Sequence, residues 1–263
     1  WGILKRRQIR SCRIKYTSRW ADGDGKRFRM EIWEKLDDLP LSWRHGVMAL
    51  GMFDGLHLGH QRVIRRATAL AAQEGVPSIV LTFRNHPLSV IAPEREPLYI
   101  EEPGTRREVM ERLGVEGLLE LPFTAALARV TAADFLARLV ARTKPSCLVV
   151  GRNYSFGDGG QGNPEYLRRR EEDLGYRTEI CPLEIDGKVV SSTRIRELLR
   201  DGLLSEVNRL LGRPFAISGI VSHGDARGRS LGFPTANLPL PSRRAMLANG
   251  VYAVQARFAG WDR

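Results

Sequence analysis

The sequence predicts an α/β protein with a doubly wound parallel sheet, followed by the beginning of an all-β domain. Three observations support this prediction. Short apolar segments alternate with helix-like segments from residue 45 to residue 211. The segment 78–83 (SIVLTF) is almost wholly apolar, as expected of a parallel strand covered on both faces. After Gly212-Arg213-Pro214 no further helical pattern appears.

The expected elements follow one another in βα order. The expected strands are residues 45–53, 78–83, 117–123, 147–150 and 176–182. The expected helices are residues 61–73, 105–113, 131–143, 164–174, 191–200 and 203–211. Gly75, Gly114 and Gly212 stand at typical helix stops, and Thr131 opens a capping-type sequence, TAAD. Ligands of doubly wound sheets bind at the carboxyl ends of the strands, so the residues that follow each strand are candidates for a site.

Residues 212–263 have a different pattern. Segments 215–221 and 250–258 have strand patterns, and the glycine-rich stretch 224–232 lies between them. Roughly 50 residues are few for a closed barrel. We therefore expect one domain over residues 30–205 and the start of a second over residues 206–263, and we infer that the chain is truncated.

The charge is concentrated at the N-terminus. The 263 residues have a net charge of +11, of which residues 1–29 supply +8 through ten basic and two acidic side chains. Residues 30–263 carry only +3, which argues against a nucleic-acid-binding body. We expect residues 1–29 to be a disordered extension or non-native translation upstream of Met30, and a nucleic-acid arm is the alternative.

Cysteine usage and hydropathy favour a cytoplasmic protein. Cys12, Cys147 and Cys181 are odd in number and far apart, which predicts neither a disulfide framework nor a zinc site. No apolar run approaches the length of about 20 residues that spans a bilayer, and the basic N-terminus has no apolar core of a secretory signal. We expect no membrane partner.

The ten residues from Gly51 to His60 (GMFDGLHLGH) lie between an expected strand and an expected helix. Such a turn brings backbone N–H groups and imidazoles to a phosphate chain at a helix N-terminus. His57 and His60 can donate to phosphate oxygens and stabilise charge that grows on them. The alternative is two surface histidines, and zinc is disfavoured because no third ligand has a suitable spacing.

A second phosphate-binding candidate is the start of the helix at 191–200 (SSTRIR at 191–196). Hydroxyl side chains at a helix start cap it and bind phosphate oxygens, and Arg196 can present a charged fork to the β- and γ-phosphates. The alternative is an ordinary cap on a solvent-facing basic helix.

Three further segments are candidates for binding an acceptor or a second nucleotide. Residues 82–87 (TFRNHP) place His86 at the ligand edge, where it could contact phosphate or a flavin-like substrate. Residues 151–157 (GRNYSFG) combine an amide with aromatic rings that suit a planar heterocycle. Residues 228–237 (GRSLGFPTAN) could hold a nucleotide with Mg²⁺ through oxygens. Each segment could instead be a structural turn or a surface loop.

These segments, in this order, resemble the bacterial bifunctional FAD synthetases, which join a riboflavin kinase to an FMN adenylyltransferase. The resemblance covers residues 30–263 and includes GVYA at 250–253; FPTAN at 233–237 is its most specific part. It implies a Rossmann-like nucleotidyltransferase domain (30–205) and part of a riboflavin kinase β-barrel (206–263). It also implies ATP, FMN and riboflavin as substrates, with Mg²⁺.

The resemblance also implies roles for particular residues. His57, His60 and Arg196 would be catalytic. The ATP-binding residues would be Gly51, Phe53, Asp54, Gly55, His57, Gly59, His60, Ser192, Thr193 and Arg196. The flavin-binding residues would be Phe83, His86, Pro87, Asn153 and Phe156. Thr235 and Asn237 would bind the Mg²⁺-nucleotide of the kinase.

The chain departs from the family pattern at four places. Asn85 stands where the family often has Pro, Asn153 where Asp is common, and Asp158-Gly159-Gly160 where several members have basic residues. These departures leave the flavin and phosphate contacts of the 151–163 loop open. The kinase base of the family is a Glu beyond the GVYA strand, so we expect this 263-residue chain not to phosphorylate riboflavin, whereas a full-length parent would.

The expected main reaction converts FMN and ATP into FAD and pyrophosphate. The FMN phosphate is already anionic at neutral pH, so positioning and electrostatic stabilisation suffice without a general base. The rivals are other HxGH transferases that use pantetheine phosphate, nicotinamide mononucleotide or CTP with a polyol phosphate, and a basic nucleic-acid-binding protein. The FPTAN segment argues against the transferases, and only residues 1–29 support the nucleic-acid binder.

Overall fold

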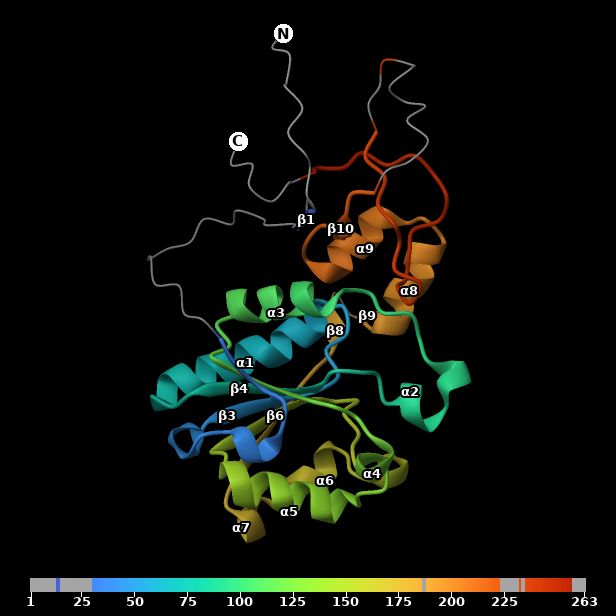
Figure 1. Ribbon diagram of the computed structural model, residues 1–263. Coiled ribbons are helices and arrows are strands. Elements are labelled where there is room, and N and C mark those ends of the chain that lie inside the picture. The colour runs from blue at the N-terminus through green and yellow to red at the C-terminus, as the bar shows by residue number, and fades with distance from the viewer. Residues whose placement is uncertain (1–12, 15–29, 186–187, 223–231, 233–234, 257–263) are drawn as a thin grey trace.

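The computed structural model describes residues 13–14, 30–185, 188–222, 232 and 235–256. At its centre is a six-stranded sheet whose neighbouring strands are all parallel (Figure 1). In spatial order its strands are β2 (Glu31–Trp33), β5 (Gly117–Leu121), β4 (Ser78–Phe83), β3 (Val47–Leu50), β6 (Cys147–Gly151) and β7 (Arg177–Cys181). The predicted parallel α/β sheet is therefore confirmed.

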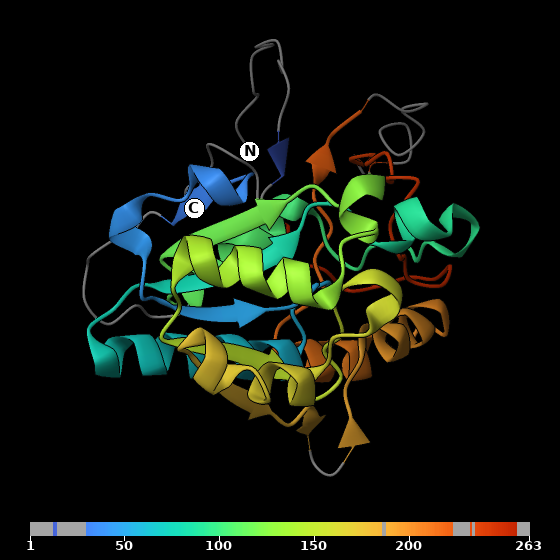
Figure 2. The same cartoon turned by 90° about the horizontal axis from the view of Figure 1, so that it is seen from below.

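Helices cover both faces of this sheet. The α-helices are α1 (Leu58–Glu74), α2 (Leu88–Ile91), α3 (Pro103–Arg112), α4 (Ala125–Ala128), α5 (Ala132–Thr143), α6 (Pro164–Arg168), α7 (Glu171–Leu174), α8 (Ser192–Arg200) and α9 (Leu204–Leu211). Short 3-10 helices are η1 (Leu36–Asp38), η2 (Leu41–Trp43), η3 (Pro93–Arg95) and η4 (Asp158–Gly160). Figure 1 shows α1 and α3 on one face and α5, α6 and α7 on the other, and Figure 2 shows the second group in front of the sheet.

The central strand β3 explains why both faces need cover. All four of its residues are buried. Val47 and Ala49 belong to the apolar cluster beneath α1, whereas Met48 and Leu50 belong to the cluster beneath α5. Because successive strand residues point to opposite faces, a wholly apolar strand is stable only between two layers.

The structure confirms one predicted helix start and differs from two predicted elements. The Thr131 hydroxyl accepts from the Asp134 N–H at 3.1 Å and caps α5, which confirms the predicted capping sequence. The single helix expected at 164–174 is wrong: α6 and α7 are separated at Arg169 and Arg170. The strand expected at 45–53 is confirmed only over β3 (Val47–Leu50), because the chain after Leu50 turns toward α1.

The order of the strands reverses beside β3. The chain passes from β3 to β4 on one side of it, and β6 lies on the other side. The carboxyl ends of β3 and β6 are neighbours, since Leu50 pairs with Val150. In sheets of this kind ligands bind at such a reversal. The turn after β3 and the loop after β6 both begin there.

The C-terminal part packs on the sheet domain through α8 and α9. Ile195, Leu199 and Val207 form a third apolar cluster, which also contains Ile100 and Ala245. Helix α9 runs through the expected domain division at residues 205 and 206. The remaining strands form two pairs, β8 (Glu184–Ile185) with β9 (Lys188–Val189) and β1 (Arg13–Ile14) with β10 (Gly219–Ile220).

The expected β-barrel is not seen in the described residues. The strand predicted at 250–258 is wrong over 250–256, where Val251 and Val254 are exposed and no backbone ladder forms. The strand predicted at 215–221 is reduced to β10. A ladder needs a partner backbone, and that of β10 is the two-residue β1. Residues 1–12, 15–29, 223–231, 233–234 and 257–263, with most of the expected basic extension and glycine-rich stretch, lie outside the described residues.

Candidate active site

The turn between β3 and α1 has an unusual backbone. Phe53, Gly55 and Leu56 have φ angles of 52°, 77° and 36°, all in the left-handed region. Phe53 and Leu56 are nonetheless almost wholly buried, at 1% and 0% exposure. A Cβ atom on Gly55 would lie 2.8 Å from the side chain of Ile100, so glycine is required there. Strained backbone of this kind is retained where the surrounding structure fixes it, and often at functional sites.

His57 and His60 form one stacked unit. Their ring centroids are 3.6 Å apart with an angle of 20° between the planes, and the ring of Phe53 meets His60 edge-on. Nδ1 of His57, the cap of α1, accepts from the His60 N–H at 3.2 Å. An accepting Nδ1 places the proton of the neutral ring on Nε2. Nδ1 of His60 is buried and has no partner among the described residues.

Both histidines are neutral at neutral pH. Burial lowers the pKa of His57 to about 4, and the nearby positive charge of Arg213 contributes. Burial also holds the pKa of His60 well below its usual range, with a further contribution from His57. The pair can therefore offer hydrogen bonds to an anion without carrying charge of its own.

Asp54 ties the turn to the start of α8. Its carboxylate accepts from the Ile100 N–H at 3.1 Å and pairs with the guanidinium of Arg196. The Ser192 hydroxyl donates to the Asp54 carbonyl at 2.8 Å. Burial raises the pKa of Asp54, and Arg196 opposes that rise. The two predicted phosphate-binding segments are thus in contact, with Thr193 exposed beside them.

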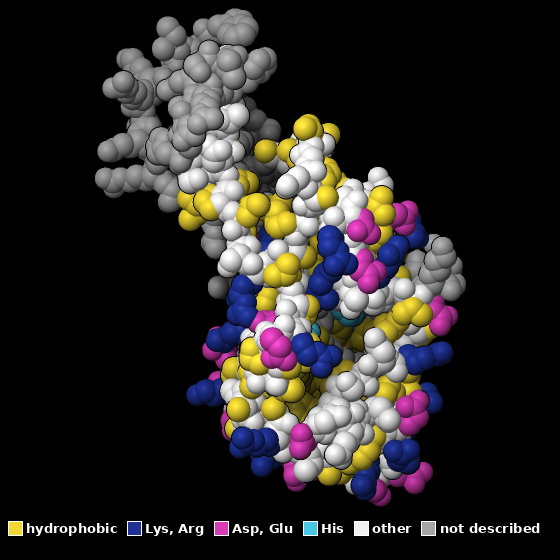
Figure 3. All heavy atoms as spheres, turned by 90° about the vertical axis from the view of Figure 1, so that its right-hand side faces the viewer, with side chains coloured by type: hydrophobic (Ala, Val, Ile, Leu, Met, Phe, Trp, Pro, Cys, Tyr) yellow, Lys and Arg dark blue, Asp and Glu magenta, His cyan; other side chains and the backbone are white. Residues whose placement is uncertain are grey.

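One pocket of about 260 Å³ collects residues that follow three neighbouring strands. The predicted site residues that line it are Gly51, Phe53, His60, Phe83, His86, Pro87 and Asn153. Figure 3, which views the carboxyl edge of the sheet, shows histidine side chains inside a hollow on this face. The structure therefore brings the HxGH turn and most of the predicted flavin-binding residues to one place.

An adjoining pocket of about 610 Å³ is mainly apolar. Phe83, Pro87 and Ser155 line both pockets, and Phe156 lines the apolar one. Other apolar side chains come from α2, α4 and α5, namely Val90, Ile91, Leu127 and Phe135. A pocket of this volume is large enough for a ligand with a fused ring system.

Some predicted residues lie outside these two pockets. His57 is only 2% exposed and lies against the His60 ring. Arg196 is held by Asp54 and also donates from Nε to the Leu98 carbonyl at 2.6 Å. Thr235 and Asn237 are exposed and line neither pocket, and the Asn237 carbonyl accepts from the Ser222 N–H at 2.9 Å.

Sequence reasoning missed several residues that shape the site. The side-chain amide of Asn85 accepts from the Phe123 N–H at 2.9 Å and donates to the Phe123 carbonyl at 3.0 Å. The Tyr99 hydroxyl accepts from the His86 N–H at 2.8 Å. Arg213 reaches the turn itself from the segment after α9. Its only signal in the sequence was a position between a helix-stopping glycine and a proline.

The described residues contain neither a metal-binding cluster nor a membrane-spanning helix. No group of three or more His, Cys, Asp or Glu side chains within the described part of the chain could hold a metal ion. In the same residues, no helix combines the length and the hydropathy needed to cross a bilayer.

Open parallel sheets bind nucleotides where the order of their strands reverses, and the pocket with His60 opens at that point. The fold and the site thus define a nucleotide-binding α/β protein. The family model for FAD synthetase matches residues 40–194, and that for riboflavin kinase matches residues 211–262. The chain belongs to the FAD synthetase family.

Named relatives agree with this assignment. A bifunctional riboflavin kinase/FMN adenylyltransferase of Listeria monocytogenes is 37% identical over 215 residues, covering 81% of this chain and 68% of the relative. Its counterpart in Escherichia coli is 34% identical over 211 residues, covering 80% and 67%. A crystal structure described as a macrolide-efflux protein from Streptococcus pneumoniae has a TM-score of 0.74 and 36% identity, covering 85% of this chain and 73% of that one.

Proposed function

We propose that this protein transfers the adenylyl group of ATP to the phosphate of FMN, giving FAD and pyrophosphate. The observation that carries the proposal is the pair of adjoining pockets, one lined by His60 and the other by apolar and aromatic side chains. Membership of the FAD synthetase family supplies the substrates. A triphosphate beside His60 and a flavin ring in the apolar pocket would meet at the residues shared by the two pockets, Phe83, Pro87 and Ser155.

In this proposal the histidines stabilise the phosphates by hydrogen bonding. His60 contacts the triphosphate from the pocket. His57 donates a second hydrogen bond from its Nε2–H when a phosphate oxygen reaches its ring. Because the low pKa values keep both rings neutral, neither needs to lose or gain a proton during the reaction. The attacking FMN phosphate is already an anion, so catalysis rests on in-line positioning and on stabilisation of the charge that develops.

Arg196 supplies the positive charge of the proposed site. Its pairing with Asp54 holds the guanidinium beside the turn. Ser192, Thr193 and the first N–H groups of α8 lie at a helix start, a favourable place for phosphate. We propose that Gly51, Phe53, Asp54, Gly55 and Gly59 form the ATP side of the site by shaping the turn, since the carboxylate of Asp54 is already used by Arg196 and the Ile100 N–H.

The flavin side of the site follows from the pockets. We propose that Phe83, His86, Pro87, Asn153 and Phe156 surround the flavin. Phe156 packs among Phe135, Tyr154 and Tyr166, with ring centroids between 5.6 and 5.9 Å away, so its position is fixed before a ligand arrives. A rigid aromatic wall lowers the ordering cost of binding.

Mg²⁺ is proposed to enter with ATP. It typically binds through one or two carboxylates plus substrate phosphates. When bound, it would neutralise phosphate charge. The exposed hydroxyl of Thr235 and amide oxygen of Asn237 fit the same chemistry, and we propose them as ligands of the second, kinase nucleotide.

Further proposals concern organisation. We propose an adenylyltransferase domain from residue 30 and a riboflavin kinase segment that begins after α9, because α8 and α9 fall largely between the two family matches. We propose small-molecule substrates, without nucleic acid or membrane partners, and a cytoplasmic location. The rival HxGH transferases are disfavoured by the riboflavin kinase match.

The deciding experiment incubates the purified protein with Mg²⁺, ATP and FMN and follows FAD and pyrophosphate by chromatography and a coupled assay. Equimolar FAD and pyrophosphate are expected. Parallel reactions with pantetheine phosphate or nicotinamide mononucleotide in place of FMN should give no dinucleotide. If one of these acceptors reacts and FMN does not, the proposed function is wrong. Riboflavin in place of FMN tests the kinase activity that the names of the relatives include.

A further inference from the structure

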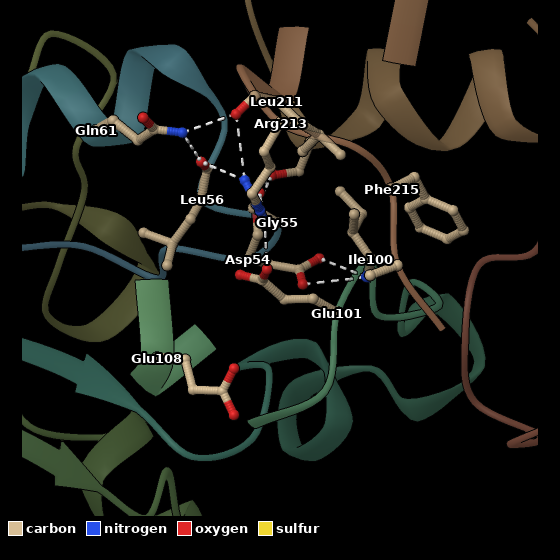
Figure 4. Close-up of polar contacts among 12 residues, drawn as sticks. Asp54, Gly55, Leu56, Gln61, Ile100, Glu101, Glu108, Leu211, Arg213 and Phe215 are labelled. Carbon is tan, nitrogen blue, oxygen red and sulfur yellow. Dashed lines mark hydrogen bonds and ion pairs between the residues drawn. The ribbon is translucent and has the colours of Figure 1, made fainter. Parts of the chain in front are cut away.

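Arg213 connects the segment after α9 to the turn that carries His57. Its Nη2 donates to the Gly55 carbonyl at 3.0 Å, and its Nη1 donates to the Leu56 carbonyl at 3.1 Å (Figure 4). Arg213 lies outside the FAD synthetase match and inside the riboflavin kinase match. The side chain is 11% exposed, so these contacts are buried within the protein.

The two carbonyls belong to the strained part of the turn. Gly55 and Leu56 have positive φ angles and directly precede His57. In this turn both carbonyls accept from one guanidinium. A buried carbonyl needs a donor, and the planar fork of arginine can serve two at once. The orientation of the His57 peptide therefore depends on the hydrogen bonds that Arg213 makes.

Glu101 and Gln61 fix Arg213 in place. The Glu101 carboxylate, 4% exposed, lies 2.5 Å from Nη2 of Arg213. Nε2 of Gln61, which follows the HxGH turn on α1, donates to the carbonyls of Leu56 and Leu211 at 2.8 and 2.7 Å. Nη1 of Arg213 also donates to Leu211, at 3.2 Å. Figure 4 shows this network joining the turn, α1, the end of α9 and the segment before α3.

We propose that Arg213 is a positioning residue for adenylyl transfer, supplied to the HxGH turn by the riboflavin kinase segment. The inference rests on the proposed function. It assigns Arg213 no contact with substrate; the guanidinium acts by holding the Gly55 and Leu56 carbonyls and hence the start of α1. The site for adenylyl transfer is thus completed by a residue from beyond its own family match.

The test compares four variants of the full chain. Arg213→Met removes the donors and leaves Glu101 without its cation. Arg213→Met/Glu101→Gln removes the donors and the carboxyl together, because burial raises the pKa of Glu101 to about 7 and only Arg213 and other nearby donors oppose that rise. Arg213→Lys keeps a cation for Glu101 but loses the fork. Arg209→Met is the control, because Arg209 lies on α9, is about half exposed and pairs with Glu206.

Each variant is measured for kcat, for the KM values of ATP and FMN, and for its thermal midpoint. In the double variant kcat should fall about 10- to 100-fold, the effect of a small misplacement in an active site, while the KM of FMN stays within about twofold. The lysine variant should also lose about tenfold in kcat. The control should match the wild type.

Charge balance and positioning give different results in this design. If the double variant recovers the thermal midpoint of the wild type and keeps the low kcat, positioning is supported. If it recovers kcat as well, or if the lysine variant retains the kcat of the wild type, the inference is overturned. Should Arg213→Met fail to fold, the double and lysine variants still decide. If the wild type, the control and the Arg213 variants all make FAD at the same rate, the inference is wrong and the proposed function stands. If the wild type makes no FAD, the proposed function itself is wrong.

Discussion

The imidazole rings of His57 and His60 stack with their centroids 3.6 Å apart, and the first of them caps α1 through Nδ1. Two parallel rings at this distance cannot both be protonated without strong repulsion, and burial disfavours the charge on each. The pair therefore combines two properties. It is a neutral donor set for phosphate, and it is a buried group whose stability depends on pH.

Replacement of His60 should affect catalysis more than binding. His60 lines the pocket, and its Nδ1 has no partner among the described residues. In His60→Ala we expect kcat to fall by about 10²- to 10³-fold, the usual loss when one donor to a developing charge is removed, with a modest change in the KM of ATP. The control is His45→Asn, at an exposed position before β3 whose positive φ Asn tolerates. An unchanged kcat in His60→Ala would remove His60 from the mechanism.

Acid should destabilise the protein through these histidines. The pKa of His57 is about 4 in the folded chain against a usual 6.5. Between these values the unfolded chain binds a proton that the folded chain does not, so the free energy of unfolding falls as the pH drops from 6.5 towards 4. Above 6.5 this contribution is fully present. The slope is at most about 1.4 kcal/mol per pH unit for each histidine.

Urea unfolding from about pH 7 to about pH 5 measures this slope. His57→Asn should unfold with a shallower pH dependence, because Asn has no titrating group and its side-chain oxygen can still accept at the cap of α1. His45→Asn is the matched control, since His45 is exposed and has a positive φ of 65° that Asn tolerates. Equal slopes in the wild type and His57→Asn would contradict the prediction.

The fold was predictable where local pattern decides the structure. Strand β4 was predicted over its full length because a run of six mostly apolar residues is typical of a covered strand. Helix α5 was predicted because TAAD is typical of a capped helix start, and the Thr131 hydroxyl does accept from the Asp134 N–H and donate to the Asp134 carboxylate. Strand β2 was missed, since its three residues at the sheet edge are too few to show a period. The break between α6 and α7 was missed for a similar reason, because charged residues carry the helical pattern across it.

The site was predictable in so far as it lies at the ends of parallel strands. That rule alone placed His60, Phe83 and Asn153 together, and one pocket contains all three. The pair of Arg213 with Glu101 is different, because it joins residues 112 positions apart through a tertiary contact that no periodicity specifies. The burial of His57 behind His60 likewise depends on the strained turn and its packing.

Loss of Arg196 should destabilise the protein in a pH-dependent way. Arg196→Met leaves the Asp54 carboxylate buried without its cation, which costs about 3 kcal/mol at neutral pH for pairs of this kind. Burial already raises the pKa of Asp54, and removal of Arg196 raises it further. The deficit relative to the wild type should therefore shrink as the pH falls and Asp54 takes up a proton.

The control for Arg196 is on the same helix. Arg194 forms an exposed pair with Glu197 at 3.2 Å, and Arg194→Met should cost less than about 0.5 kcal/mol with no pH dependence. Urea unfolding of both variants near pH 7 and near pH 5 makes the comparison. The prediction is contradicted if Arg196→Met loses as little stability as Arg194→Met, or if its loss of stability grows in acid. In either case the pair with Asp54 does not stabilise the turn.

Replacement of Asn85 should weaken flavin binding. Its amide joins the loop after β4 to the Phe123 backbone after β5, and both loops line the apolar pocket. Asn85→Ala removes these bonds and should cost about 1–2 kcal/mol of stability. The freed loops must be ordered again when the flavin binds, so the dissociation constant of FMN should rise roughly fivefold, or about 1 kcal/mol.

Ser78→Ala provides the comparison, because Ser78 lies at the opposite end of the same strand. Its hydroxyl bonds the Gly114 carbonyl and the Glu116 N–H at 3.1 and 3.2 Å, so its loss should lower stability by a similar amount without changing the pocket. Quenching of FMN fluorescence gives the dissociation constants, and the KM of ATP should be unchanged in both variants. If Ser78→Ala weakens FMN binding as much as Asn85→Ala does, the effect follows from general loss of stability, and Asn85 does not shape the flavin pocket.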